Sequence, residues 1–333
     1  MALLLTESDV RQLLTMEMAL SAVEESFQRL GDGTALLHSR QRLFVPGGSY
    51  LHYMAAADVH RGYMGMKIYT SSRDGLRFIV PLFNAVSGEL LALVEADYLG
   101  QMRTGAASGV ATRVMARVDA TKVGLIGTGL QARTQLTAIA LVRRIERVRV
   151  FGRDARRREK FSSEMTEQMK IPVDAVETAE AAVRDADIIV TSTTASQPVL
   201  SGAWLRPGMH INAIGANFPQ KRELDDTAVL RADIVAVDSR EQAKMEAGDL
   251  IQAYSSDARR WDAVRELAEI VADRVSGRVR PDDITLFKSS GIAIEDVVTA
   301  SRVYEKAIEM KIGNHIPLWE HEEQFDQRQP RTR

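Results

Sequence analysis

The sequence predicts an α/β protein that combines a doubly wound parallel sheet with a smaller α+β domain. Three observations indicate this fold class. The chain has 333 residues, which is too long for one typical core and about right for two domains. Residues 39–100 form short strand-like runs separated by turns, as in a mixed or antiparallel sheet. From residue 121 onward, apolar strands alternate with helical stretches, which is typical of a parallel sheet.

The smaller domain is predicted to begin with a helix over residues 6–30. Thr6 and Asp9 resemble a capping pair, apolar residues recur at helical spacing, and a GDG triplet follows. After the β-rich segment, residues 103–117 (RTGAASGVATRVMAR) predict a second helix, in which Gly and Ala let another backbone approach closely. Ordinary helix packing explains these small residues equally well.

The larger domain is predicted to begin with the strand KVGLIG, followed by a helix from about residue 130. Further strands are expected at RVRVFG, ADIIVTST, MHINAIG, ADIVAVD and, near residue 284, ITLFKSSG. The last predicted element is a long amphipathic helix in IAIEDVVTASRVYEKAIEM.

Composition excludes several classes of function. The net charge of −2 gives no basic footprint for a nucleic-acid partner. The chain has no cysteine, which excludes disulfides, thiol nucleophiles and Cys-ligated zinc and fits a reducing cytosol. None of the six histidines has metal-ligand spacing, no apolar run approaches the length of a membrane span, and the N-terminus is no signal peptide. We therefore expect a cytoplasmic protein without a metal or a membrane partner.

Residues 123–132, VGLIGTGLQA, carry the pattern Gly127-x-Gly129-x-x-Ala132 between an apolar strand and a helix. Gly127 permits the tight turn, Gly129 lets the backbone approach a pyrophosphate, and Ala132 allows close contact between helix and strand. The N-terminus of the helix supplies free N–H groups for phosphates. This context predicts a Rossmann domain that binds a dinucleotide, against the alternative that the glycines serve packing alone.

The second strand predicts which dinucleotide is preferred. An NAD site usually has an acid about 20 residues after the glycines, for the ribose 2′-OH. Gly152 stands there instead, followed by Arg153 and further arginines. This favours NADP(H), with NAD(H) possible. The alternative is that Asp154 caps the next helix and the arginines form a solvated face.

Three cations and one histidine of the first domain are candidate site residues. Lys67 lies in MGMKIYT, a run so apolar that a charged lysine needs a partner or a lowered pKa. Arg42 and Arg103 could hold a carboxylate by bidentate contacts, although each, taken alone, reads as a surface residue and their spacing does not show that they converge. His52, taken alone, reads as a core or surface histidine.

The sequence resembles the ornithine cyclodeaminase/μ-crystallin family. The matching stretches are GMKIYT, RTGAASGVAT, GLIGTGLQA, GMHINAIGANFPQKRELDD and TLFKSSGIAIEDVVTA, in this order through most of the chain. The resemblance implies a substrate-binding and dimerisation domain over 1–117 and 300–333, a Rossmann domain over 118–299 that carries NAD(H) or NADP(H), and a homodimer.

The resemblance also implies roles for individual residues. Lys67 matches the active-site lysine, and Arg42 and Arg103 match the arginines that hold the substrate α-carboxylate. His52 falls where cyclodeaminases carry a glutamate near the substrate amine. Asn217 falls where cyclodeaminases and related alanine dehydrogenases carry a catalytic aspartate. The residues expected at the coenzyme are Thr104, Gly127, Thr128, Gly129, Leu130, Gln131, Gly152, Arg153, Thr193, Ile214 and Lys288.

The two departures indicate the reaction. Cyclodeamination needs a group that moves protons, and the amide of Asn217 cannot do so at neutral pH. We therefore expect an NAD(P)H-dependent reductase that converts an α-imino acid, such as Δ1-pyrroline-2-carboxylate, Δ1-piperideine-2-carboxylate or iminosuccinate, into an α-amino acid. The alternatives are an alanine-type amino-acid dehydrogenase, an ornithine cyclodeaminase, and a non-enzymatic, crystallin-like binding protein.

Overall fold

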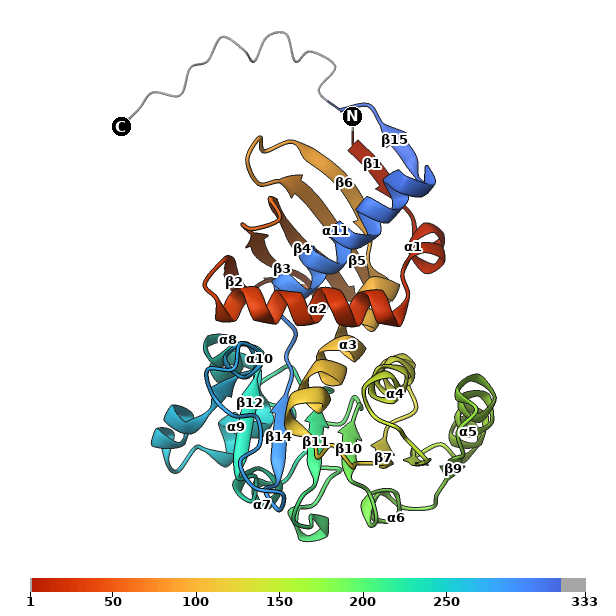
Figure 1. Ribbon diagram of the computed structural model, residues 1–333, viewed down its shortest axis with the longest axis vertical. Coiled ribbons are helices and arrows are strands. Elements are labelled where there is room, and N and C mark those ends of the chain that lie inside the picture. The colour runs from red at the N-terminus through yellow and green to blue at the C-terminus, as the bar shows by residue number, and fades with distance from the viewer. Residues whose placement is uncertain (1, 319–333) are drawn as a thin grey trace.

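The computed structural model describes residues 2–318, which form two sheets stacked end to end with helices around them (Figure 1). The first sheet has the strand order β15-β1-β6-β5-β4-β3-β2 and is mixed, since β1 runs parallel to β6 and the other pairs are antiparallel. Its strands are β1 (Ala2–Leu5), β2 (Ala35–Val45), β3 (Ser49–Asp58), β4 (Tyr63–Ser72), β5 (Gly75–Asn84), β6 (Leu90–Glu95) and β15 (Asn314–Ile316).

Helices α2 (Met16–Gly31) and α11 (Ala293–Met310) cover one face of this sheet (Figure 1). The N-terminal segment forms two helices rather than the single predicted one. Helix α1 (Glu7–Leu13) has the predicted capping box of Thr6 and Asp9. The chain is extended at Leu14, and the Thr15 hydroxyl caps α2 by accepting from the backbone N–H of Met18. A second N-cap therefore interrupts an otherwise continuous helical pattern.

Helix α3 spans Asp97–Met115 and begins six residues earlier than predicted. The Glu7 carboxylate accepts the backbone N–H groups of Asp97 and Tyr98, so a residue distant in sequence satisfies this helix end. As a consequence, Arg103 lies in the second turn of α3 and not at its start. The small residues do serve close contact, because a Cβ at Gly105 would lie 2.5 Å from the backbone oxygen of Thr134.

The second sheet is parallel throughout, in the order β13-β12-β14-β11-β10-β7-β8-β9, and confirms the predicted doubly wound fold. Its strands are β7 (Lys122–Ile126), β8 (Arg147–Phe151), β9 (Val173–Ala175), β10 (Ile188–Thr191), β11 (His210–Ala213), β12 (Ile234–Val237), β13 (Arg265–Glu266) and β14 (Thr285–Lys288). The surrounding helices are α4 (Leu130–Val142), α5 (Ala155–Met169), α6 (Ala179–Val183), α7 (Asp226–Leu230), α8 (Arg240–Glu246), α9 (Gly248–Ala253) and α10 (Leu267–Val271), with 3-10 turns at Gly202–Trp204 and Ala258–Ala263.

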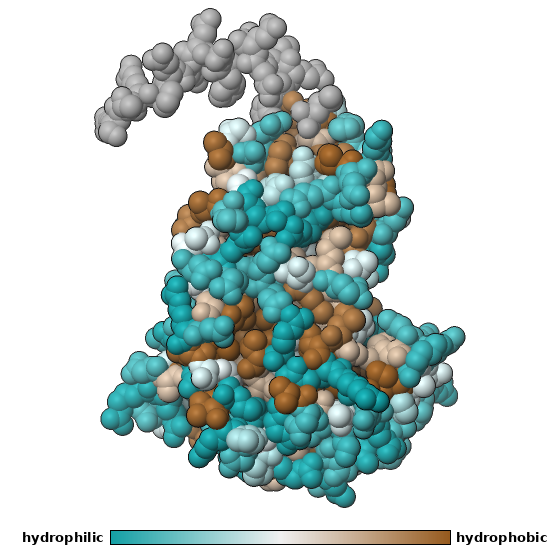
Figure 2. All heavy atoms as spheres, in the orientation of Figure 1, coloured by the Kyte–Doolittle hydropathy of each residue, from teal (hydrophilic) through white to brown (hydrophobic). Residues whose placement is uncertain are grey.

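The two domains share a continuous core. Residues of α2, α3, α4 and α10 belong to one buried apolar cluster, and Figure 2 shows apolar residues gathered where the domains meet. Helix α11 packs along the first sheet and α2. The predicted boundary between residues 299 and 300 therefore falls inside α11, and the chain crosses between the sheets at residues 289–292. Among residues 2–318, no helix has the length and apolar character needed to span a bilayer.

Candidate active site

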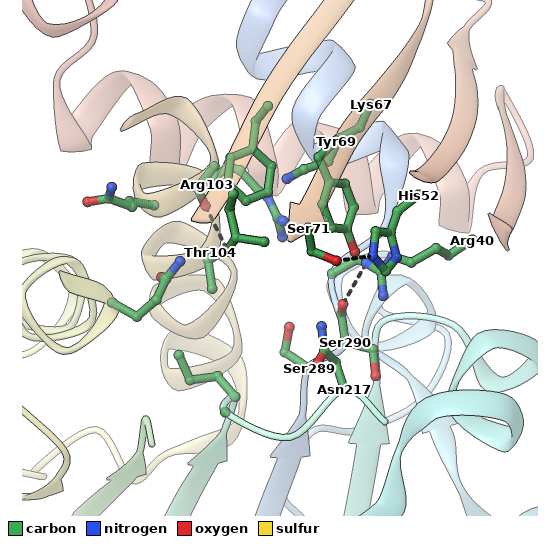
Figure 3. A pocket seen from close by; sticks show the side chains of 18 of the residues that line it. Arg40, His52, Lys67, Tyr69, Ser71, Arg103, Thr104, Asn217, Ser289 and Ser290 are labelled. Atoms are coloured by element: carbon green, nitrogen blue, oxygen red, sulfur yellow. Dashed lines mark hydrogen bonds between the residues drawn. The ribbon is translucent and has the colours of Figure 1, made fainter. Parts of the chain in front are cut away.

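A cavity of about 370 Å³ opens between the domains, at the carboxyl ends of the parallel strands. Strands β3 and β4 and helix α3 supply one wall, which carries His52, Lys67 and Arg103. Loops after β10, β11 and β14 supply the opposite wall, which carries Asn217 and Ser290 (Figure 3). Open α/β sheets bind ligands at this edge, where the strand order reverses between β7 and β10.

Lys67 is almost fully buried, with 3% of its surface exposed. Its Nζ donates to Asp296 Oδ1 at 2.8 Å and lies 5.2 Å from the centre of the Phe78 ring. Burial, together with the charge of Arg103, lowers the pKa of Lys67 to about 8, although Asp296 opposes the shift. A lysine with this pKa can release a proton near neutral pH and recover it from water.

Arg103 lies beside Lys67 on the same wall. Its Nε donates to Asp296 Oδ1 at 3.1 Å and its Nη1 to Glu295 Oε2 at 2.8 Å. Burial opposes the charged form, but the two carboxylates raise the pKa of Arg103 above its usual value, so the guanidinium stays charged. Burial raises the pKa of Glu295 to about 8. The structure thus brings Lys67 and Arg103 together, as the resemblance implies.

Arg42 is not among the residues that line the cavity, but it lies directly behind residues that do. Its Nη2 pairs with Glu246 Oε1 at 2.7 Å and donates to the backbone oxygen of Asn217 at 3.0 Å, while its guanidinium lies over the Phe218 ring. Arg40 lines the cavity instead. Its Nη2 donates to the backbone oxygens of Ser290 and Gly291, both at 3.0 Å, and its Nη1 pairs with Glu246.

A one-residue bulge in β2 explains why the sequence does not reveal Arg40. The pairing with β3 shifts between His38 and Gln41, so one extra residue lies in β2. His38 pairs with Ala55 on the outer face, whereas Arg42 pairs with His52 on the inner face. An unbroken alternation would place both on the same face.

His52 belongs to a row of side chains on the inner face of the sheet. Arg42, His52, Tyr69 and Phe78 are directly paired across four strands. The His52 ring stacks on Tyr69 with centroids 4.2 Å apart, and its Nε2 lies 3.0 Å from Ser71 Oγ. Burial, with the charges of Arg42 and Arg40, lowers the pKa of His52 to about 4, so the ring is neutral at pH 7. His52 therefore offers a polar, uncharged surface to the cavity.

The glycine loop after β7 can receive a dinucleotide. Gly127 has φ +121°, and a Cβ there would lie 2.2 Å from the Ser192 backbone oxygen, so only glycine fits. Gly129 is the N-cap of α4, and nothing lies within 4 Å of where its Cβ would be. Open space beside free helix N–H groups is what a pyrophosphate needs. Leu130 is exposed at the start of α4, while Gln131, Thr104 and Ile214 line the adjoining cavity.

Position 152, at the end of β8, carries glycine and no acidic residue. A Cβ at Gly152 would lie 2.9 Å from the Thr128 side chain, so an acidic residue would require Thr128 to move. Asp154 caps α5 by accepting from the backbone N–H of Arg157, as the alternative interpretation expects. Arg153 is exposed and forms no ion pair with any described residue. The capping role of Asp154 and a ligand-binding role for Arg153 are thus compatible.

Two predicted coenzyme residues, Lys288 and Thr193, are not among the residues that line the cavity. Lys288 is completely buried, pairs with Asp249 at 3.2 Å and donates to the Ala216 backbone oxygen at 2.6 Å. This corrects its predicted contact with the coenzyme, because Lys288 supports the loop after β11 from beneath. The backbone N–H of Thr193 donates to Glu223 Oε1 at 2.6 Å, and Glu223 also accepts from Gly215. Glu223 therefore holds two cavity loops together.

Comparisons with known proteins agree with this geometry. A model of the ornithine cyclodeaminase/mu-crystallin family matches residues 1–311. The chain belongs to this family. It is 40% identical over 261 residues to a Δ(1)-pyrroline-2-carboxylate reductase of Bacillus cereus, covering 76% of this chain and 80% of the relative.

Two solved structures of the family superpose closely on this chain. One is a Δ(1)-pyrroline-2-carboxylate reductase of Thermococcus litoralis in complex with NADH and L-proline, with a TM-score of 0.90, 37% identity and coverage of 94% of this chain and 100% of that one. The other is an archaeal alanine dehydrogenase dimer with bound NAD, with a TM-score of 0.89, 34% identity and coverage of 95% and 99%. The predicted resemblance is thus confirmed.

Sequence reasoning missed three groups at this family site: Arg40, the acids Glu295 and Asp296, and Glu223. The acids stand in an amphipathic helix, where charged residues usually face water. One signal was available, because a buried Lys67 requires an anion and IAIED places two acids directly after a strand and a Gly turn.

Proposed function

We propose that this chain is an NAD(P)H-dependent reductase of α-imino acids. The observation that carries the proposal is the cavity in which the Lys67 ammonium and the Arg103 guanidinium face the loops of a dinucleotide-binding domain. A planar imino acid has a carboxylate for the guanidinium and a nitrogen for the ammonium. The relatives that reduce Δ(1)-pyrroline-2-carboxylate support this assignment.

In the reaction, the substrate carbon of the C=N bond gains a hydride and the nitrogen gains a proton, which yields an amine. The bound coenzyme supplies the hydride from its nicotinamide ring. Arg103 binds the carboxylate and fixes the orientation of the substrate. Lys67 donates a proton or a hydrogen bond to the nitrogen and later recovers its proton from water. Asn217 orients the substrate or a water molecule, since its amide cannot move protons.

The candidate substrates are cyclic imines such as Δ1-pyrroline-2-carboxylate or Δ1-piperideine-2-carboxylate, with the acyclic iminosuccinate as a further candidate. An alanine-type dehydrogenase is the second candidate function, because the archaeal relative carries that name. Coenzyme consumption should be compared with preformed cyclic imines and with pyruvate plus ammonia. We expect rapid turnover of the cyclic imines. Turnover with pyruvate and ammonia alone would favour the dehydrogenase, and coenzyme binding without any turnover would favour a crystallin-like binding protein.

We further propose that NADP(H) is preferred over NAD(H). Gly152 leaves no negative charge for a ribose 2′-OH, and exposed Arg153 stands beside it. A guanidinium favours a 2′-phosphate over a hydroxyl. We also propose that the enzyme is cytoplasmic, because a chain without cysteine fits a reducing compartment.

Arg153→Ala tests the coenzyme preference. We expect the dissociation constant for NADPH to rise about tenfold, which corresponds to about 1.4 kcal/mol, while the constant for NADH changes little. Arg147→Ala is the matched control, because Arg147 is also an exposed arginine but lies at the other end of β8. Titration of both coenzymes against the three proteins measures the effect. If the Arg153 variant binds NADPH and NADH more weakly by the same factor, the proposed preference for NADP(H) is contradicted.

We also propose a homodimer that forms through the outer face of the first sheet. Leu36, Ala57, Met64 and Phe83 are paired in one row across four strands there and line an apolar hollow of about 450 Å³. Leu36 is 61% exposed, and such contiguous apolar surface usually marks an interface. A second copy is the occupant we assign, in agreement with the dimeric alanine dehydrogenase.

Leu36→Asp tests this interface. We expect the wild type to be dimeric in light-scattering measurements and the variant to be monomeric, because the dimer would bury an unpaired carboxylate. Val118→Asp is the matched control, since Val118 is 91% exposed and lies in the link between α3 and β7 and not in the first sheet. Loss of the dimer in both variants, or in neither, would argue against this face.

A further inference from the structure

A buried cluster of charges lies directly behind the reacting end of the cavity. Strand β4 contributes Lys67, helix α3 contributes Arg103, and the first turn of α11 contributes Glu295 and Asp296. All four side chains are at least nine-tenths buried. Figure 3 shows Lys67 and Arg103 side by side on the wall opposite Asn217. The three elements are distant in sequence, so only the fold brings these charges together.

One carboxylate oxygen joins the two cations. Asp296 Oδ1 accepts from Lys67 Nζ at 2.8 Å and from Arg103 Nε at 3.1 Å. Asp296 Oδ2 has no hydrogen-bond partner among residues 2–318. Because both bonds end on the same atom, the position of Asp296 sets the distance between the ammonium and the guanidinium.

The acids also decide which part of Arg103 can reach a ligand. Nε is bound by Asp296 and Nη1 by Glu295, whereas Nη2 donates to no acceptor among the described residues. Gly291 packs closely against the guanidinium, since a Cβ there would lie 2.5 Å from Nη1. The guanidinium is thus held in one orientation, with Nη2 left for a substrate carboxylate.

The charge balance makes Asp296 the main anion of the cluster. The groups that act on Lys67 are Asp296 on α11, Arg103 on α3 and Arg40 on β2, and only Asp296 is negative. Burial raises the pKa of neighbouring Glu295 to about 8, Arg103 opposes this shift, and Asp238 and Asp296 add to it, so Glu295 is a weaker source of negative charge than its ordinary pKa suggests. Without Asp296, Lys67 would face two positive charges in a buried site.

We propose that Asp296 is a positioning residue for imine reduction, which holds the Lys67 ammonium and the Arg103 guanidinium at a fixed spacing so that both face one substrate. The inference rests on the proposed function. Asp296 exchanges no atom with the substrate: the hydride comes from the coenzyme, the proton comes from Lys67, and Lys67 regains its proton from water. Asp296 acts by keeping Lys67 charged and by orienting Arg103.

Asp296→Asn tests the electrostatic part of this role. Reduction needs protonated Lys67, so kcat/KM of the wild type falls as the pH rises through the pKa of this lysine, near 8. Asp296 raises that pKa, and its loss lowers it. In the variant we expect the midpoint of the pH profile to move down by about one to three pH units, the range that a close opposite charge produces. A midpoint that stays in place would overturn the proposal.

Asp296→Glu tests whether Asp296 fixes the spacing of the two cations. It also tests the proposal if the asparagine variant does not fold. The charge remains, but the longer side chain moves the oxygen that both cations share. We expect the pH midpoint to stay near the wild-type value while kcat falls about tenfold, because misplaced reacting groups lose near-attack geometry. Wild-type kcat in this variant would contradict a positioning role.

Asp249→Asn is the matched control. Asp249 and Lys288 form another fully buried aspartate–lysine pair, at 3.2 Å, beneath the loop after β11, which belongs to the wall opposite Lys67. Breaking it should lower Tm while the pH midpoint stays where it is in the wild type. The same downward move in this control would assign the effect to lost stability and overturn the proposal. A wild type that reduces no imino acid would instead refute the proposed function, so the two failures are distinguishable.

Discussion

Replacing Lys67 with methionine is expected to lower kcat for imine reduction about a hundredfold or more, the usual contribution of a positioned proton donor. Methionine keeps much of the side-chain length but cannot protonate the substrate nitrogen. Asp296 retains its bond to Arg103 at 3.1 Å, so the buried carboxylate keeps one cation and the variant should fold. Steady-state kinetics with a cyclic imine and NADPH provide the measurement.

Coenzyme binding separates a catalytic role for Lys67 from a structural one. Because Lys67 lies on the wall opposite the Rossmann loops, the dissociation constant for NADPH should stay near the wild-type value in the methionine variant. Circular dichroism and a thermal melt check that the protein is folded. A folded variant that binds NADPH and retains wild-type kcat would exclude Lys67 as the proton donor.

A second large effect is expected in the glycine loop, where one alanine substitution should lower stability and another should weaken coenzyme binding. Gly127→Ala places a Cβ 2.2 Å from the Ser192 backbone oxygen at φ +121°, so we expect a loss of stability of about 1–3 kcal/mol from overpacking and strain. Gly129→Ala has open space and an ordinary φ of −86°, so its Tm should hardly change.

Gly129→Ala should instead act on the coenzyme. The added methyl group stands where the backbone is expected to approach the pyrophosphate, and a cost of about 1.4 kcal/mol already weakens binding tenfold. Thermal melts and NADPH titrations of both variants give the two readouts. Unchanged NADPH affinity in Gly129→Ala would argue that the dinucleotide does not lie on this loop.

Local patterns made the Rossmann half of the fold predictable. The strand KVGLIG, the glycines that follow it and the alternation of apolar strands with helices are signals within a few residues of each other. Lys67 could also be recognised, because a lysine in an apolar strand is chemically conspicuous. In each case the residue and its immediate neighbours carry the information.

Long-range contacts explain what the sequence did not reveal. The bulge between His38 and Gln41 turns Arg40 toward the cavity, and it depends on the partner strand. Helix α3 begins at Asp97 because Glu7 caps it from a distance. Lys288 stands next to cavity-lining Ser289, yet it points beneath the loop toward Asp249. Such positions follow from tertiary packing, which single-sequence patterns do not encode.

In the proposed reaction, a hydride passes from the reduced coenzyme to the carbon of a C=N bond. The most direct test uses NADPH deuterated at both C4 positions of the nicotinamide together with Δ1-pyrroline-2-carboxylate, and locates the label in the product by NMR and mass spectrometry. We predict proline with one deuterium at Cα. Oxidised coenzyme without labelled proline, or no reaction with any imino acid, would contradict this hydride transfer.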